Sequence, residues 1–397
     1  MTASIITICI LLLVGYIFDI SSSKTKIPSI ILLLILGWGV RQVTSLFRIP
    51  VGDLTPLLPV LGTIGLILIV LEGSLELKLD KSRLPMIGKS SLIAFIQLIV
   101  LSFTLGYAFS YFEGVSLKIG VINAIPLAII SSAIAIPSAR NLISHKRDFV
   151  TYESSLSDIF GVILFNFIAL HETFGMETFG LFSLQLLLLV IISFVFSVAL
   201  ALLLSKIKHN VKFTPIILLI ILIYTISKIY HLPSLVFILL FGLFIGNLDK
   251  LNRFKIIDRL QPEILIKEVQ KFKELNVEMT FLIRSLFFLL FGYLIETSEL
   301  TNTDTMLWAL GITVGIFILR AILLKLFKFP MESLLFMAPR GLITILLFLS
   351  IPISQTVGIA NRSLIIQVII LTSLLMMYGL MNTKVETKLT EEPLEED

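Results

Sequence analysis

The chain has few of the side chains on which metal and redox sites depend. It contains one cysteine, Cys9, which excludes an intramolecular disulfide and a site built from several cysteines. The four histidines, His145, His171, His209 and His231, are scattered without the spacing of metal ligands. The sequence also shows no nucleophile–base pair. We therefore expect no cofactor and no enzyme active site.

Charge is scarce as well. Of the 397 residues, 15% are charged and 57% are hydrophobic, and the mean hydropathy is +1.02. Soluble domains are about half apolar and about a quarter charged, so this composition predicts a polytopic protein embedded in a lipid bilayer. The formal net charge of +4 comes from basic residues concentrated in certain loops. That pattern describes membrane topology, and we expect no nucleic-acid partner.

Apolar runs long enough to span a bilayer predict an all-α protein of about thirteen transmembrane helices. The expected spans are 3–20, 27–44, 56–77, 86–112, 117–142, 148–170, 179–206, 212–229, 232–248, 276–297, 304–327, 330–353 and 362–382. With the N-terminus outside, the inner segments hold 23 of the 31 Lys and Arg residues and the outer segments hold five, Arg41, Arg48, Lys118, Lys228 and Arg362. This asymmetry places the C-terminus in the cytoplasm. The amphipathic loop 251–275 is expected to lie on the cytoplasmic surface.

Two of the expected spans are interrupted by proline. The fifth contains Pro137 and the twelfth contains Pro339. Proline frees a backbone carbonyl one turn back, which in lipid needs a new partner or a cation. The two breaks match if spans 1–6 repeat as spans 8–13 in inverted orientation, with the seventh as a connector. Broken helices at matching positions in two halves are typical of a transport site. The alternative interpretation is two ordinary proline kinks.

One acid, Asp158, lies in the middle of the sixth apolar span. A carboxylate at membrane depth costs several kcal/mol unless it faces a partner or a watery cavity. Helical spacing puts Ser154 on the same face, with Glu153 and Ser157 on the adjoining one. One interpretation is a structural ion pair inside a helical bundle. The interpretation that we favour is a site for a small cation or a proton.

These residues resemble the monovalent cation:proton antiporter superfamily, in its NhaP/NHE-type branch. That family carries Glu-x-x-x-Asn-Asp on its sixth helix, and Glu153 to Asp158 matches it except that Ser157 replaces Asn. The family's Thr-Asp-Pro on the fifth helix is reduced to the proline of Ala135-Ile136-Pro137. Further short similarities extend the resemblance over nearly the whole chain: Leu71-Glu72-Gly73, Arg284-Ser285-Leu286-Phe287-Phe288, Arg320 and Arg340-Gly341.

The resemblance implies a homodimer in which a core moves vertically against a dimerisation domain. The dimerisation domain would comprise 1–84 and 211–299, and the core would comprise 85–171 and 300–383. The connector would be 172–210, and 384–397 would be a disordered acidic tail. Asp158 would bind cation and proton in turn, with Ser154, Ser157 and a carbonyl near Ala135 as further ligands.

The resemblance also implies a structural ion pair between Glu153 and Arg340, with Arg320 as the second choice of partner.

Antiport needs one site at which cation and proton exclude each other, and a carboxylate provides this. Hard oxygen ligands suit Na⁺, Li⁺ or K⁺. We expect electroneutral one-for-one exchange at a bacterial inner membrane, serving pH homeostasis. A cation channel and an organic-anion symporter of related inverted-repeat fold are the alternatives.

Overall fold

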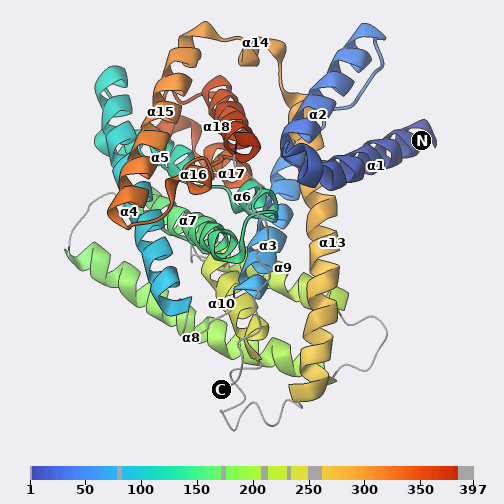
Figure 1. The fold of residues 1–397 in the computed structure, drawn as a ribbon, viewed down its shortest axis with the longest axis vertical. Helices are drawn as coiled ribbons and strands as arrows, with labels where there is room; N and C mark the ends of the chain where they lie inside the picture. The colour runs from blue at the N-terminus through green and yellow to red at the C-terminus, as the bar shows by residue number, and fades with distance from the viewer. Residues whose placement is uncertain are drawn as a thin grey trace, which may run out of the picture.

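A computed structural model describes residues 2–77, 83–170, 176–206, 213–229, 234–248 and 262–382. Within these ranges the chain forms helices and no strand, as Figure 1 shows. Seven of the described helical segments are long and apolar enough to cross a membrane. Large apolar side chains such as Leu13, Leu307 and Ile318 are exposed on the outside of the helices. A multi-pass membrane protein presents such a surface to lipid.

The helices follow the apolar runs of the sequence. The first half of the chain contains α1 (Thr2–Thr25), α2 (Ser29–Leu46), α3 (Leu57–Glu76), α4 (Leu84–Glu113), α5 (Leu117–Ala128), α6 (Ser132–Ser138), α7 (Ser144–Leu170) and α8 (Met176–Lys206). The second half contains α9 (Phe213–Ile229), α10 (Ser234–Gly246), α13 (Pro262–Leu294), α14 (Thr297–Leu300), α15 (Thr303–Leu326), α16 (Met331–Leu334), α17 (Leu342–Ser350) and α18 (Arg362–Asn382).

Each expected span overlaps one of these helices or a pair of them. The fifth corresponds to α5 and α6 and the twelfth to α16 and α17, so both expected interruptions are present. The count of thirteen membrane crossings and the repeat relation between the halves remain predictions. The acidic tail 384–397 lies outside the described residues.

The loop 251–275 differs from the expectation. Residues 251–261 lie outside the described part, but Pro262 begins α13, a continuous helix of 33 residues that runs to Leu294. The expected separate surface helix is therefore wrong for 262–275, which forms the first part of α13. The sequence explains the continuity, because no proline or glycine stands between Glu263 and Phe291 to break the helix.

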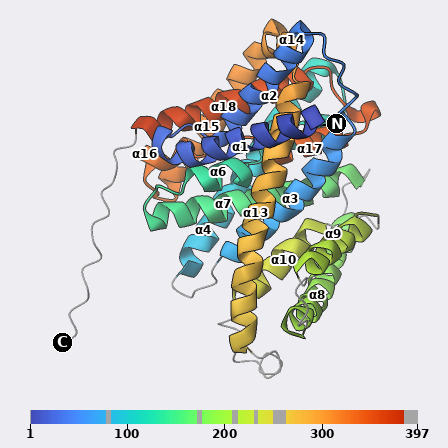
Figure 2. The same ribbon diagram turned by 90° about the vertical axis from the view of Figure 1, so that its right-hand side faces the viewer.

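The described helices pack as two groups. In one group α13 packs against α2 and α3, and α10 packs against α3, α8 and α9. In the other α4 packs against α5, α7 and α15, and α15 packs against α18. Figures 1 and 2 show α13 running the length of the first group, with α15 and α18 in the other. The groups meet where α3 contacts α6, α7 and α17.

A short linker joins α13 of the first group to α15 of the second, and both groups contact it. Arg362 Nη2 of α18 also donates to the Leu294 carbonyl at the end of α13, at 2.6 Å. On the side of α2, Trp38 Nε1 and Gln42 Nε2 each donate to Thr297 Oγ1, both at 3.3 Å. On the side of α18, Arg362 pairs with Glu299 at 3.1 Å, and Gln367 Nε2 donates to the Asn302 carbonyl at 2.9 Å. The four-residue helix α14 (Thr297–Leu300) carries Thr297 and Glu299, and Asn302 follows it.

Candidate functional site

The two interrupted helices cross at their breaks. The first break lies at residues 129–131 between α5 and α6, and the second lies at 335–341 between α16 and α17. The Ser131 N–H donates to the Pro339 carbonyl at 2.8 Å. A Cβ added at Gly341 would stand 2.7 Å from Ser131 Oγ. Glycine at this position therefore leaves room for the Ser131 and Ile134 side chains to lie against the second break.

The first break does not lie at the expected proline. Pro137 is inside α6, whereas Pro339 is in the second break as expected. The chain can unwind earlier because its backbone donors find partners there: the Ile130 N–H donates to Ser157 Oγ at 3.0 Å, and the Ser131 N–H is satisfied across the crossing. The prediction of a break at Pro137 is therefore corrected by six to eight residues toward the N-terminus of this span.

Asp158 lies beside this crossing. Its side chain is buried, with the residue only 1% exposed. Oδ2 accepts a hydrogen bond from the Ser132 hydroxyl and a longer one, at 3.4 Å, from the Ser132 N–H. Oδ1 has no hydrogen-bond partner. A buried carboxylate oxygen without a partner is costly, so this atom is available to bind a proton or a cation.

The other three expected ligands surround the crossing but do not contact Asp158 by hydrogen bonds. Ser154 Oγ donates to the Val150 carbonyl at 2.7 Å. Ser157 Oγ accepts from the Ile130 N–H, and the Ala135 carbonyl accepts from the Ala139 N–H at 3.0 Å. Hydroxyl and carbonyl oxygens keep a second lone pair when they accept one bond. These contacts therefore leave the ligand role of the three residues open.

Ser132 is the residue in contact with Asp158 that the sequence analysis did not predict. It is the first residue of α6 and supplies both hydrogen bonds to Asp158. A signal was present, because Ser131 and Ser132 are adjacent hydroxyls within the apolar run from Ala124 to Pro137. The family resemblance centres on Pro137, which lies five residues beyond Ser132.

Glu153 forms a buried ion pair on α7, one turn before Ser157. Arg320 Nη1 and Nη2 donate to its two carboxylate oxygens at 2.7 and 2.9 Å, and both side chains are at most 1% exposed. Arg320 Nε donates to the Leu334 carbonyl at 2.8 Å, next to the second break. The second choice of partner is therefore the one observed, and the expected pair with Arg340 is corrected.

Arg340 instead neutralises the carboxyl end of α5. Nε donates to the Leu127 carbonyl at 2.8 Å, and Nη2 donates to the Ala128 carbonyl at 3.2 Å. Nη1 donates to the Ala338 carbonyl at 2.8 Å. The last carbonyls of a helix lack partners and carry a partial negative charge, so a cation is stabilised there. One arginine thus ties the end of α5 to the opposite break.

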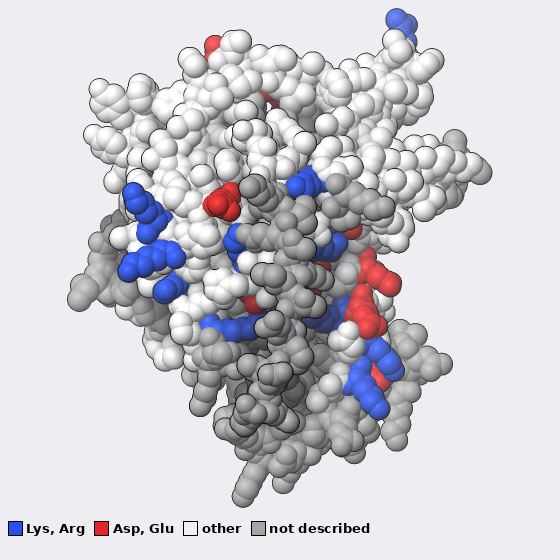
Figure 3. Space-filling model, in the orientation of Figure 1, with Lys and Arg blue, Asp and Glu red and all other residues white. Residues whose placement is uncertain are grey.

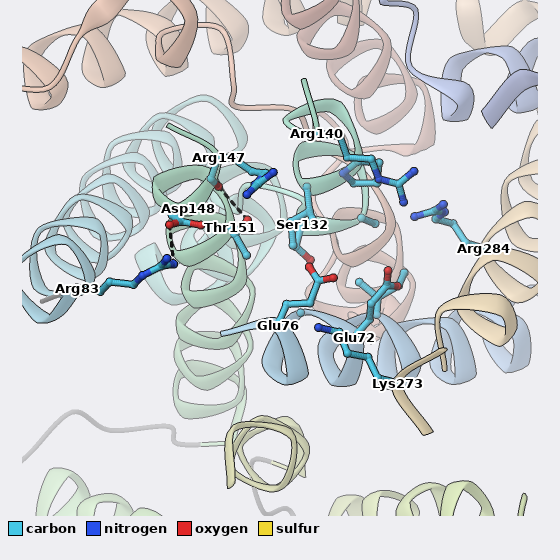
Figure 4. A pocket seen from close by; sticks show the side chains of 15 residues that line it. Glu72, Glu76, Arg83, Ser132, Arg140, Arg147, Asp148, Thr151, Lys273 and Arg284 are labelled. Carbon is cyan, nitrogen blue, oxygen red and sulfur yellow. Dashed lines mark hydrogen bonds and ion pairs between the residues drawn. The ribbon is translucent and has the colours of Figure 1, made fainter. Parts of the chain in front are cut away.

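A cavity of about 370 Å³ leads from the crossing toward the surface. Figure 4 shows it between Glu72 and Glu76 of α3 on one side and the α6–α7 region on the other. Ser132 lines the cavity and also contacts Asp158, so it connects the two. At the cavity wall Arg83 and Asp148 form an ion pair at 2.6 Å.

Asp19 of α1 joins the two helix groups near this cavity. It pairs with Arg284 of α13 at 3.7 Å, within its own group. It also pairs with Arg140, in the turn between α6 and α7, at 3.6 Å. Arg140 and Arg284 both line the cavity, and Figure 4 shows them facing one another. The pair between Asp19 and Arg140 crosses from one group to the other.

Comparisons with known proteins agree with this architecture. The family model described as "Sodium/hydrogen exchanger, transmembrane" matches residues 8–382. A search of curated protein sequences finds no match. Two solved structures of the sodium proton antiporter NhaP1 from Methanocaldococcus jannaschii are similar in fold, one at pH 8 and one from electron microscopy. Their TM-scores are 0.66 and 0.65, each with 19% identity over 96% of this chain and 95% of the other.

Proposed function

Because the chain belongs to the sodium/hydrogen exchanger family and is a cation:proton antiporter rather than an enzyme, we propose that Asp158 is the residue at which cation and proton exchange. The observation that carries the proposal is its buried carboxylate with one unpartnered oxygen. A protonated carboxyl is neutral and does not hold an alkali cation, whereas the ionised group attracts one. One group thus serves both substrates in turn.

The oxygen atoms around Asp158 supply the remaining ligands in this proposal. Ser132 is the nearest, and Ser154, Ser157 and the Ala135 carbonyl complete the set if the breaks adjust when the cation enters. All are hard oxygen donors, which suits Na⁺ or Li⁺, and K⁺ where the site is wider. The cation would reach them through the cavity that Ser132 lines.

Replacement of Asp158 tests the assignment. D158N removes the charge with little change in size and should abolish cation-dependent proton movement in proteoliposomes while the protein still folds. D53N is the matched control, because Asp53 lies in the exposed segment before α3 and accepts from the Thr55 N–H at 2.9 Å. Cation-driven exchange by D158N at the wild-type rate would refute the assignment.

We expect exchange of one cation for one proton. Glu153 is held by Arg320, and Ser132 and Ser157 are neutral, so Asp158 is the carboxylate free to cycle. Moving one net charge against 100 mV is worth about 2.3 kcal/mol, so an electrogenic cycle would respond to voltage. The final pH gradient in proteoliposomes should be equal with and without a potassium-diffusion potential. A gradient that scales with the imposed potential would mean that a further charge moves.

The two helix groups support the proposal that one part of the molecule is static and the other moves during transport. The group with α1–α3, α9, α10 and α13, from 1–84 and 211–299, would be the static dimerisation domain of a homodimer. The group from 85–171 and 300–383 would be the moving core, with α8 in 172–210 as connector. In this proposal the cavity opens to the cytoplasm of a bacterial inner membrane, the N-terminus is outside, the C-terminus is inside, and exchange serves pH homeostasis. Cysteine labelling from either side of the membrane would test the orientation.

A further inference from the structure

Three lysines of the proposed core lie together at one end of α4 and α15. Lys89 is in the second turn of α4, Lys325 is in the last turn of α15, and Lys328 follows that helix. The ring of Phe329 lies between the two elements, with Lys89 Nζ 5.8 Å from its centroid. All three lysines are exposed. Figure 3 shows basic side chains gathered at this edge of the molecule.

Backbone hydrogen bonds order the end of α15, which carries Lys325 and Lys328. The Phe329 N–H donates to the Leu324 carbonyl at 2.9 Å, and the Lys328 N–H donates to the Lys325 carbonyl at 3.2 Å. Lys328 itself is left-handed, with φ of 59°, a conformation that glycine adopts at lower cost at a helix end. The Phe329 ring is held in turn by Phe149 of α7, with 4.3 Å between centroids. The cluster is therefore built on ordered elements.

Helix-end electrostatics account for only part of this cluster. A positive side chain is favourable at the carboxyl end of α15, which explains Lys325 and Lys328. Lys89 lies near the amino end of α4, where the helix dipole disfavours a positive charge. Among the described residues no carboxylate pairs with any of the three, and Glu332 of the following helix is in no ion pair with them.

Apolar surface continues from the lysines along both helices. Leu92 and Phe95 on α4, and Ile318, Ile322 and Leu326 on α15, are each 48% to 69% exposed. Helices α4 and α15 are in contact. Helical spacing puts Lys325 on the side of α15 that carries Ile318 and Ile322, and Lys89 one turn from Leu92 on α4, so basic and apolar side chains adjoin on each helix. Lysines at the end of a membrane-spanning helix lie at headgroup level, and the apolar side chains of the same helix lie at the depth of the acyl chains.

We propose that this face binds an anionic phospholipid, with the phosphate at Lys89, Lys325 and Lys328 and the acyl chains along α4 and α15. The chemistry selects a lipid over a soluble anion because the apolar and basic parts are contiguous. Attraction of an anionic headgroup is worth about fivefold in affinity for each nearby lysine. The site is on the proposed core, away from the α1–α3 and α13 group, so the lipid would travel with the core.

The test measures lipid binding directly. Purified full-length protein is titrated with phosphatidylglycerol or phosphatidylcholine, and bound lipid is followed by native mass spectrometry and by thermal stability. The wild type should bind and be stabilised by phosphatidylglycerol. K89Q/K325Q/K328Q should raise its half-saturating concentration on the order of 100-fold, from about fivefold for each lysine, while K89R/K325R/K328R should keep it.

The matched control removes the same charge elsewhere. K118Q/K228Q/K267Q changes three exposed or half-exposed lysines away from this face and should bind phosphatidylglycerol as the wild type does. Inorganic phosphate should not displace the lipid; displacement would indicate a soluble-anion site and overturn the proposal. Equal phosphatidylglycerol affinity of the wild type and K89Q/K325Q/K328Q, or equal affinity for phosphatidylcholine, would overturn it as well.

Discussion

At the scale of single residues, the contact between Ser132 and Asp158 sets the character of the site. The serine brings a neutral hydroxyl to the break, in a span that carries no acid, whereas the family pattern places an acid in the corresponding helix. A site with one free carboxylate holds a cation by a single full charge and several oxygen dipoles. We therefore interpret Ser132 as a residue that tunes cation affinity.

S132A tests this interpretation. The variant loses one ligand oxygen and the hydrogen bond to Asp158, and a hydrogen bond to a charged group is worth about 1.5–3 kcal/mol. The apparent KM for the cation should rise about tenfold or more in proteoliposomes, with proton exchange still detectable at saturating cation. S155A is the control, since Ser155 is buried on α7, the helix of Asp158, without a hydrogen-bond partner. An unchanged KM in S132A would remove Ser132 from the cation site.

The sequence revealed Asp158 because a lone acid in an apolar helix has few structural explanations. It did not reveal Ser132, because the position of the break depends on Ser157 and Pro339, which are distant in the chain. The choice between Arg320 and Arg340 depends likewise on how α15 and the second break stand against α7. Local patterns specify which residues are unusual, whereas partners across helices require the packed structure.

At the scale of elements, the Glu153–Arg320 pair fastens α7 to α15 and, through the Leu334 carbonyl, to the second break. Removing one partner leaves a buried charge alone. E153Q or R320Q should therefore lower the free energy of unfolding by about 3–5 kcal/mol, whereas the double variant should lose less than the sum. Thermal or chemical unfolding in detergent measures the coupling. Additive losses would show that the two residues do not act as a pair.

Arg340 provides the comparison for that cycle. Its three donor positions are occupied by the carbonyls of Leu127, Ala128 and Ala338. The coupling of Glu153 with Arg340 should consequently be much smaller than the coupling with Arg320. The crossing at the two breaks, the Arg340 hydrogen bonds and the Glu153–Arg320 pair together connect α5, α7, α15 and the second break near Asp158.

At the scale of the whole molecule, the Asp19–Arg140 pair favours the conformation described here, with the cavity open between the two helix groups, over the other conformations of the transport cycle. It crosses between the two helix groups, and its side chains are 19% and 53% exposed. A partly exposed pair is worth about 0.2–1 kcal/mol. D19N should therefore lower the population of this conformation relative to the others by up to about fivefold. In a C9S/T151C background, a membrane-impermeant reagent should then modify the thiol introduced at position 151, on the cavity wall, more slowly.

The control is E296Q, which breaks the Arg41–Glu296 pair at 3.1 Å. Arg41 is on α2, and Glu296 lies two residues after the end of α13, so this pair does not join the two groups. Its loss should leave the modification rate unchanged. Equal rates in the parent and D19N proteins would show that the Asp19–Arg140 pair does not bias the conformation.

The α13–α15 linker sets how far the two groups can separate. As a helix, the four residues of α14 cover about 6 Å, at about 1.5 Å per residue. Fully stretched they reach about 14 Å, at about 3.3–3.6 Å per residue. The difference of about 8 Å is slack stored in one helical turn. Unwinding α14 breaks the Arg362–Glu299 pair within it, and a longer travel must also release Thr297 at one end or Asn302 at the other. Separation must also break the hydrogen bond from Arg362 Nη2 to the Leu294 carbonyl at the end of α13. This linker therefore acts as a tether that limits the stroke.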